Sequence, residues 1–306
     1  MSSAGQASAT SLAARALSGA LEPVIGQVYF APECHLAYEK LGFGPSAHSM
    51  KGVALPDAAA YFTSRGSLLG QVSGSVVASA FAVFDPVVVI AAVRHGWSLT
   101  DAPSIRAIRH GGAVGHLSRL LQGTPAGIEE VNQALERAVD ACRPEGRPLF
   151  AGVISEAIPA DGLDRLFVLG DALREFRGDA HTAAWTSAGL DAVEIGLLTE
   201  RYWGLPFKSY VRTRAWSEAE LDSGLERLQS AGYVDAEGAR LTESGAAWRE
   251  RIEERTDDQM TPAIAAIGGG FEQALTVLAS WGATVRAGFG YPVSGPHELA
   301  RAMASR

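Results

Sequence analysis

The chain has 306 residues, with 47% hydrophobic and 20% charged side chains and a formal net charge of −8. This length supplies material for two ordinary domains or for one extended helical body. The acidic balance argues against general affinity for nucleic acids or anionic membranes.

Apolar residues recur at helical spacing along most of the chain, which predicts a mainly α fold. Residues 1–10 are rich in Ser and Ala, and we expect them to be disordered. The predicted helices span residues 11–21, 28–41, 55–64, 73–82, 86–94, 103–121, 126–142, 161–175, 179–188, 191–201, 217–231, 243–258 and 271–287.

The segment 216–257 contains, in order, an amphipathic helix, a glycine stop, a two-stranded hairpin and a capped helix. These elements are residues 217–231, Gly232, strands at 233–234 and 240–241, and a helix that begins after Thr242. This order predicts a winged-helix unit near the C-terminus of a helical body.

In such a unit the helix at 217–231 would enter a DNA groove, yet its charge is negative. It holds four acidic residues and one arginine, a net charge of −3: Glu218, Glu220, Asp222, Glu226 and Arg227. Because DNA affinity comes mainly from basic side chains that meet phosphates, this helix disfavours DNA as a partner.

The two halves of the chain show internal similarity. Asp85 precedes Trp97 by twelve positions, as Asp191 precedes Trp203, and an Arg-Gly pair opens each stretch, at 65–66 and 177–178. We interpret these matches as a degenerate tandem duplication of winged-helix-like halves, with chance as the alternative. The expected parts are a flexible N-terminus with a lead helix, a helical half, a winged-helix half and a tail, over residues 1–22, 23–175, 176–290 and 291–306.

Charged residues concentrate around position 177. Asp179 is expected to cap a helix that begins there, with His181 in its first turn. Arg177, Asp179 and His181 would then form a polar cluster that holds a ligand or fixes a histidine tautomer. The alternative is a helix cap with an Arg177–Asp179 ion pair that locks two helices together. Trp185, one turn after His181, is expected beside the ligand.

A second candidate group combines aromatic rings with an arginine. Tyr61, Phe62 and Arg65 would hold a carboxylate or stack on a planar ligand. The alternative is a helix end followed by a surface turn. His35 lies on an amphipathic helix with several aromatic residues, where it would face the same pocket or serve as a core histidine.

Several other classes of site lack support in the sequence. The spacing of a phosphate-binding loop, a metal site or a nucleophile elbow is missing, so neither a cofactor nor a metal is expected. Cys34 and Cys142 do not make a disulfide framework, which favours a reduced, cytoplasmic setting. The first 22 residues do not resemble a secretory signal, and the apolar run Val76–Val93 is broken by Asp85-Pro86, so no membrane partner is expected.

Short motifs spread over most of the chain are informative together. They are Tyr61-Phe62-x-x-Arg65, Phe81-x-x-Phe84-x-Pro86, Arg174-Glu175-x-Arg177-Gly178-Asp179-x-His181, Leu241-Thr242-x-x-Gly245 and Glu253-x-x-Thr256-Asp257. The set resembles a large actinobacterial family of chains of similar length, described as helix-turn-helix or MarR-like. The resemblance implies a winged-helix fold and a dimer through the terminal helices, and it implies no established reaction. Leu68, Val83 and Arg94 depart from the family's usual residues.

Three functions follow from these observations. The first is a small-molecule-binding protein in secondary metabolism, or in resistance by sequestration or sensing, with its pocket between the two halves. The second is a MarR-like transcriptional regulator that binds DNA. The third is a cofactor-independent enzyme in which His181 and Asp179 form an acid–base pair. The acidic helix and the arginine-bearing motifs favour the first.

Overall fold

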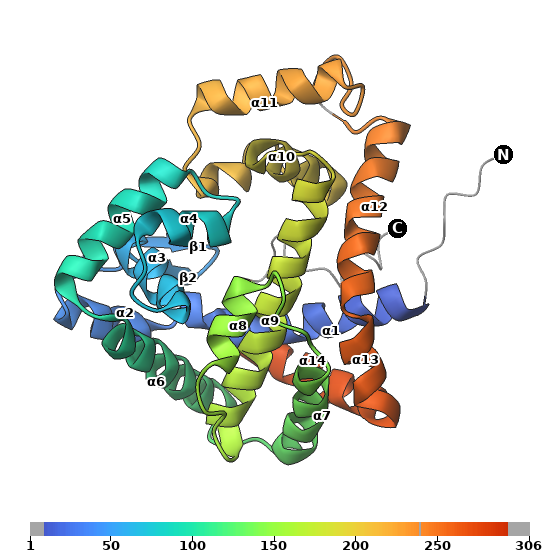
Figure 1. Ribbon diagram of the computed structural model, residues 1–306. Coiled ribbons are helices and arrows are strands. Elements are labelled where there is room, and N and C mark those ends of the chain that lie inside the picture. Colours follow the sequence, from blue (N-terminus) through green and yellow to red (C-terminus); the bar gives the residue numbers. More distant parts are fainter. Residues whose placement is uncertain (1–8, 239, 293–306) are drawn as a thin grey trace.

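The computed structural model describes residues 9–238 and 240–292. Most of these residues are helical (Figure 1), which confirms the predicted mainly α fold. The first helices are α1 (Ala9–Gly26), α2 (Pro32–Lys40), α3 (Ala58–Gly66), α4 (Gly74–Phe81), α5 (Pro86–Leu99), α6 (Ala102–Leu121), α7 (Ile128–Asp140) and α8 (Pro148–Ile154). The later helices are α9 (Gly162–Ser187), α10 (Ala192–Tyr202), α11 (Glu218–Ser230), α12 (Glu243–Gln259), α13 (Thr261–Ile267) and α14 (Phe271–Ala287). Short 3₁₀ turns are η1 (Gln27–Tyr29), η2 (Ser67–Leu69), η3 (Val211–Arg214) and η4 (Gly268–Gly270).

Helix α9 is the central element of the fold. It runs through the middle of the molecule in Figure 1 and contacts α1, α6, α7, α8 and α12. Its large apolar side chains join a core cluster that extends from α1 to α14; among them are Leu166, Phe167, Leu169, Leu173 and Phe176. Each such side chain contributes about 1.5–3 kcal/mol to the free energy of unfolding when it is fully buried. Packing therefore holds α9 in place from several sides.

The prediction of two helices at 161–175 and 179–188 is wrong, because α9 continues without a break from Gly162 to Ser187. Phe176, Ala180 and Ala184 are buried and keep the helical spacing through the region where a break was expected. Their packing outweighs the cost of Gly178 in a helix, about 1 kcal/mol. The expected boundary between residues 175 and 176 therefore falls inside one helix.

The strands also differ from the prediction. An unpredicted antiparallel hairpin joins β1 (His48–Met50) to β2 (Val53–Leu55). Its turn residues Lys51 and Gly52 both have positive φ, which suits a tight hairpin turn. The hairpin expected near the C-terminus contains a single bridge, between Val234 and Leu241, in the part of the chain that the structure describes.

Helices α10 and α11 form a small unit with its own apolar cluster, separate from the main core. Figure 1 shows α11 at the edge of the molecule, beyond α10. Two hydrogen bonds tie this unit to the α4–α5 region: Trp216 Nε1 donates to the Val83 carbonyl at 3.0 Å, and the Asp85 amide donates to the Arg214 carbonyl at 2.9 Å. Thr242 caps α12 as predicted, since its Oγ1 accepts from the Gly245 amide at 3.1 Å.

The residues proposed as repeats agree only in part. Asp85 and Asp191 both accept a backbone amide at the start of a helix, α5 and α10 respectively. The Arg-Gly pair at 65–66 ends α3, whereas the pair at 177–178 lies inside α9. The Arg-Gly match therefore does not mark equivalent positions.

By length and composition alone, the stretch Thr261–Ala287 could cross a membrane, with a mean hydropathy of 1.3. The 3₁₀ turn at Gly268–Gly270 interrupts it, and α14 packs against α1, α6 and α7. Leu278 and Trp281 are buried in those contacts. One face of α14 is therefore packed against the helical body.

Adjacent glycines in α6 provide a test of its packing against α2. A methyl group at Gly111 would meet nothing within 4 Å, whereas at Gly112 it would lie 2.4 Å from Cys34 Sγ and 2.9 Å from the Cys34 amide nitrogen. We expect Gly111→Ala to raise the free energy of unfolding by about 0.5–1 kcal/mol, because alanine is the better helix former. Gly112→Ala should lower it by about 1–3 kcal/mol through overpacking. Urea unfolding measures both, and shifts of the same sign would contradict this contact.

Candidate functional site

Three predicted site residues lie together on α3. The Tyr61 ring packs against Tyr29 and Phe62, each at 5.2 Å between centroids. Phe62 is buried, and the Arg65 guanidinium lies 4.5 Å above the Phe81 ring. These aromatic rings are packed against one another inside the fold, so they offer little open surface for stacking on a ligand.

Arg65 belongs to a buried ion network around Glu175 on α9. Its Nε and Nη2 donate to the two Glu175 carboxylate oxygens at 3.0 and 2.6 Å. Arg174 donates to the same carboxylate at 3.2 Å and to Glu22 on α1 at 3.0 Å. Burial alone would raise the pKa of Glu175, but Arg65 and Arg174 lower it to about 2. Arg65 thus anchors α3 to α9.

Arg177 belongs to a second network, between α9, α12 and α1. Its Nη2 lies 2.5 Å from Glu253 and 2.9 Å from Asp257. The network pairs three arginines with three carboxylates: Arg15, Arg177, Arg249, Glu250, Glu253 and Asp257. The expected Arg177–Asp179 ion pair is not formed, because residues two apart on a helix point in different directions.

Asp179 turns toward α8 instead. Its Oδ2 accepts the amides of Leu149 and Phe150, each at 3.0 Å, so it caps the first turn of α8. The prediction that Asp179 caps a helix of its own is wrong, since Asp179 lies inside α9. Burial raises the pKa of Asp179 to about 6, although both amides favour the charged form.

His181 lies on α9 and faces α12, where its Nδ1 is 3.0 Å from Thr256 Oγ1. That hydroxyl donates to the Ile252 carbonyl, so the imidazole nitrogen is the donor and the neutral ring carries its hydrogen on Nδ1. Burial lowers the pKa of His181 to about 3, and the nearby Arg249 contributes in the same direction. Asp179 faces α8, so the acid–base pair expected for catalysis is not formed.

The low pKa of His181 predicts a dependence of stability on pH. The unfolded chain binds a proton at this side chain below about pH 6.5, whereas the folded protein does not until about pH 3. This contribution to stability is therefore complete above pH 6.5 and is lost as the pH falls. Relative to His181→Gln, the wild type should lose about 1–2 kcal/mol of unfolding free energy between pH 7 and pH 5. Urea unfolding across that range tests this, and parallel curves would refute it.

His35 and Trp185 are core residues. His35 is 5% exposed, its Nε2 lies 3.1 Å from the Tyr29 carbonyl, and burial lowers its pKa. It borders a cavity of about 10 Å³ together with Tyr61, which is room for about one water molecule. Trp185 packs with Ile195 and Ile252 where α9 meets α10 and α12.

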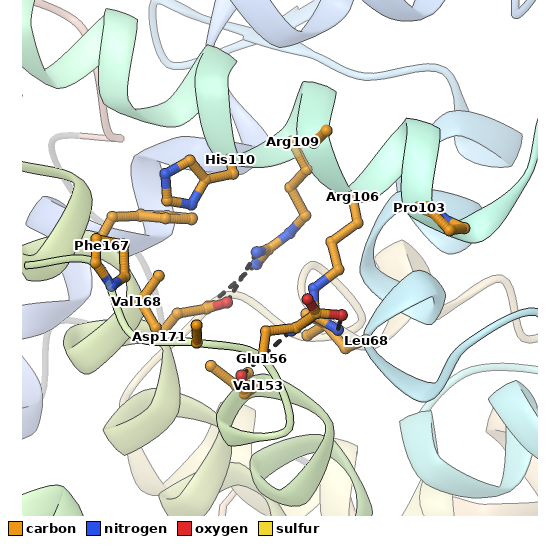
Figure 2. A pocket seen from close by; sticks show the side chains of 13 residues that line it. Leu68, Pro103, Arg106, Arg109, His110, Val153, Glu156, Phe167, Val168 and Asp171 are labelled. Carbon is orange, nitrogen blue, oxygen red and sulfur yellow. Dashed lines mark hydrogen bonds and ion pairs between the residues drawn. The ribbon is translucent and has the colours of Figure 1, made fainter.

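A larger pocket of about 280 Å³ lies between α6, α8 and α9 (Figure 2). Arg106, Arg109 and His110 reach it from α6, Asp171 from α9, and Glu156 from the loop that follows α8. Its apolar lining includes Leu68, Val153, Phe167 and Val168. The predicted site residues do not line this pocket. All of its lining residues lie between positions 68 and 171, so it is not between the two expected halves.

Arg109 and Asp171 form a fixed wall of the pocket. The guanidinium donates to both carboxylate oxygens, at 2.8 and 3.1 Å, and both side chains are buried. Burial alone would lower the pKa of Arg109, but Asp171 raises it above its ordinary value. Arg109 also borders the small cavity beside His35, so this ion pair separates the two spaces.

Arg106 is less completely neutralised. Its Nη2 donates to the carbonyls of Gly152 and Val153 at 3.0 and 3.2 Å, at the end of α8. Its Nη1 lies 3.4 Å from Glu156, a carboxylate that is 65% exposed. Burial lowers the pKa of Arg106, and Glu156 offsets this only in part.

Sequence reasoning missed these pocket residues, although one signal was present. Arg106 and His110 are four positions apart, which places them on one face of a helix. Asp171 and Glu156 carry no such signal, because only tertiary packing brings them to α6. Within residues 9–238 and 240–292, no group of three or more His, Cys, Asp or Glu side chains could hold a metal ion.

One family of known proteins matches nearly the whole chain. The chain matches the model of a helix-turn-helix family over residues 14–292. The chain belongs to this helix-turn-helix family. No curated protein and no solved structure matches it. The family match includes the pocket as well as the segment from α10 to α12.

In this helix-turn-helix protein, Lys208 beside α11 and Arg227 on α11 are both paired with carboxylates. Lys208 Nζ lies 2.9 Å from Glu218 and 2.6 Å from Asp222. Arg227 pairs with Asp191 and Glu194 on the neighbouring α10 side, at 2.5 and 3.0 Å. These pairs leave little positive charge on α11 for DNA phosphates.

Proposed function

We propose that this helix-turn-helix protein binds a small molecule in the pocket between α6, α8 and α9. The pocket itself carries the proposal. Its volume of about 280 Å³ lies near the lower end of small-molecule sites. It combines an apolar lining with a few convergent polar groups, which is the usual composition of such a site. The arginines elsewhere on α9 that the sequence pointed to are held in ion pairs with buried carboxylates.

Within this proposal the segment from α10 to α12 is a winged-helix unit that serves as scaffold or sensor. Helix α9 carries Asp171 at the pocket and Arg177 at the contact with α12, six positions apart on one rigid element. A ligand that shifted α9 would therefore act directly on α12. This supports a role in sequestration or sensing, within secondary metabolism or resistance.

The test is native mass spectrometry of the protein purified from its host. A tryptophan at Ala107, a pocket-lining residue, would obstruct the pocket, whereas a tryptophan at the exposed Ala287 on α14 would not. We expect the wild type and Ala287→Trp to retain the same small molecule and Ala107→Trp to lose it. The proposal would be contradicted if the wild type retained no small molecule, or if the Ala107→Trp variant still retained it.

A second candidate is a MarR-like DNA-binding regulator, which is favoured by the position of α11 at the edge of the molecule. The acidity of that helix opposes it. Fluorescence anisotropy with a duplex at 50 and 200 mM salt decides between the two, because binding through phosphates weakens steeply with salt, by about 10³-fold or more for several contacts. Binding with that salt dependence would establish the regulator, and no binding at 50 mM would exclude it.

A further inference from the structure

We propose that the ligand of the α6–α8–α9 pocket is a small carboxylic acid with an apolar body, whose carboxylate replaces Glu156 at Arg106. This inference rests on the proposed function and names the chemical class of its ligand.

Arg106 is the pocket cation with an exchangeable partner. Two of its contacts are to backbone carbonyls at the end of α8, which hold the guanidinium in place without neutralising it. Its ionic contact with Glu156 is long, at 3.4 Å, and Glu156 is 65% exposed. Exposed pairs of this kind contribute little, so a ligand carboxylate can displace Glu156 at small cost. An arginine fork matches a carboxylate in geometry as well as in charge.

The other nitrogen-bearing side chains at the pocket already have close partners. Arg109 makes two buried hydrogen bonds to Asp171, and His110 Nε2 lies 2.7 Å from Asp164. Figure 2 shows Arg106 and Arg109 extending side by side from α6, with Glu156 and Asp171 opposite them. Because Asp171 neutralises Arg109, Arg106 is the guanidinium at this pocket that can take a carboxylate from a ligand.

The remaining lining accounts for the apolar body. Val153 lies next to Arg106, whereas Phe167 and Val168 line the pocket on the side of His110 and Asp171 (Figure 2). Leu68, from the 3₁₀ turn η2, adds to this lining. A ligand with its carboxylate at Arg106 would bury its apolar part against these side chains, at about 25 cal/mol per Å². Burial lowers the pKa of Arg106, whereas close carboxylates raise the pKa values of Arg65, Arg109 and Arg177, which agrees with the longer ionic contact of Arg106.

The experiment compares three probes of one shape: phenylacetate, its neutral amide phenylacetamide, and the cation phenethylamine. Calorimetry with the full chain is expected to show binding of phenylacetate, with the amide and the amine at least about tenfold weaker, since a charge-assisted hydrogen bond is lost. Arg106→Met should weaken phenylacetate binding by about 10–100-fold. Glu156→Gln should strengthen it about two- to fivefold, because the competing carboxylate is removed. Arg119→Met, at an exposed arginine of α6 outside the pocket, should leave it unchanged.

Arg106→Met and Glu156→Gln are expected to change the affinity for phenylacetate in opposite directions. Glu156 is largely exposed, so Glu156→Gln tests the exchange even if Arg106→Met does not fold. Equal binding of the acid and the amide, or weaker binding in Glu156→Gln, would overturn the inference; the proposed function would stand if Ala107→Trp abolished that binding. A wild type that binds none of the three probes would also overturn the inference, while the proposed function is decided separately by the molecule retained from the host.

Discussion

Replacing Glu175 by glutamine is expected to lower the free energy of unfolding by about 3–5 kcal/mol. Glu175 is fully buried and receives two hydrogen bonds from Arg65 and one from Arg174. Removing its charge leaves Arg65 buried without a carboxylate and Arg174 with Glu22 alone. Such an uncompensated charge costs far more than the intact pair contributes. Urea unfolding at pH 7 measures the loss.

Glu145→Gln is the matched control, because Glu145 pairs with Arg143 on the surface and both side chains are exposed. We expect its unfolding midpoint to equal that of the wild type. The Glu175 effect also has a defined pH dependence. The pKa of Glu175 is about 2 when folded, so its contribution is present above about pH 4.5 and fades as the pH falls. Similar small shifts in both variants would contradict a buried network at Glu175.

The second large effect is expected at Gly245, near the start of α12. A methyl group there would lie 1.9 Å from the Tyr233 carbonyl oxygen, a backbone atom that cannot turn away as a side chain can. Gly245→Ala should therefore separate the 233–241 hairpin from α12 and cost about 3 kcal/mol. We expect faster amide hydrogen exchange in α10, α11 and the hairpin, with little change in α9, since the two regions have separate apolar clusters.

Ala247→Ser, two positions further along α12 at an exposed site, is the control for Gly245→Ala. A surface change of this kind alters stability by less than about 0.5 kcal/mol and should leave exchange unchanged. Equal loss of protection in α9 and α11 of Gly245→Ala would show that the two regions unfold together, contrary to the expectation from their separate clusters.

The charged motifs of the sequence mainly hold α9 in place. Arg65, Arg174 and Glu175 join α9 to α3 and α1, while Arg177 joins it to α12. Sequence spacing identifies such residues as unusual, but a buried ion pair and a ligand-binding arginine look the same before their partners are known. In this protein each of these arginines has a carboxylate supplied by a distant part of the chain.

The residues of the candidate pocket, in contrast, are hard to recognise from the sequence. Arg106 and His110 stand out little in the sequence, since a helix with basic residues four apart is commonly a solvated face. Their importance comes from Glu156 and Asp171, which lie 50 and 65 positions after Arg106 along the chain. No local sequence pattern predicts that these side chains lie close together, because their proximity depends on how α8 and α9 pack on α6.

The sequence by itself determined the helical character of the chain, the cap at Thr242 and the acidity of α11, because apolar periodicity, capping residues and net charge are local properties. It did not determine that α9 is a single helix, since the burial of Phe176 and Ala180 outweighs the signals for a break. Tertiary structure alone decided the partner of each buried charge. It turned Asp179 toward α8 and His181 toward Thr256, and it gave Arg106 at the pocket an exposed carboxylate at 3.4 Å. The physical reason is that a charge is neutralised by whatever packing brings to it, and packing is a property of the whole fold.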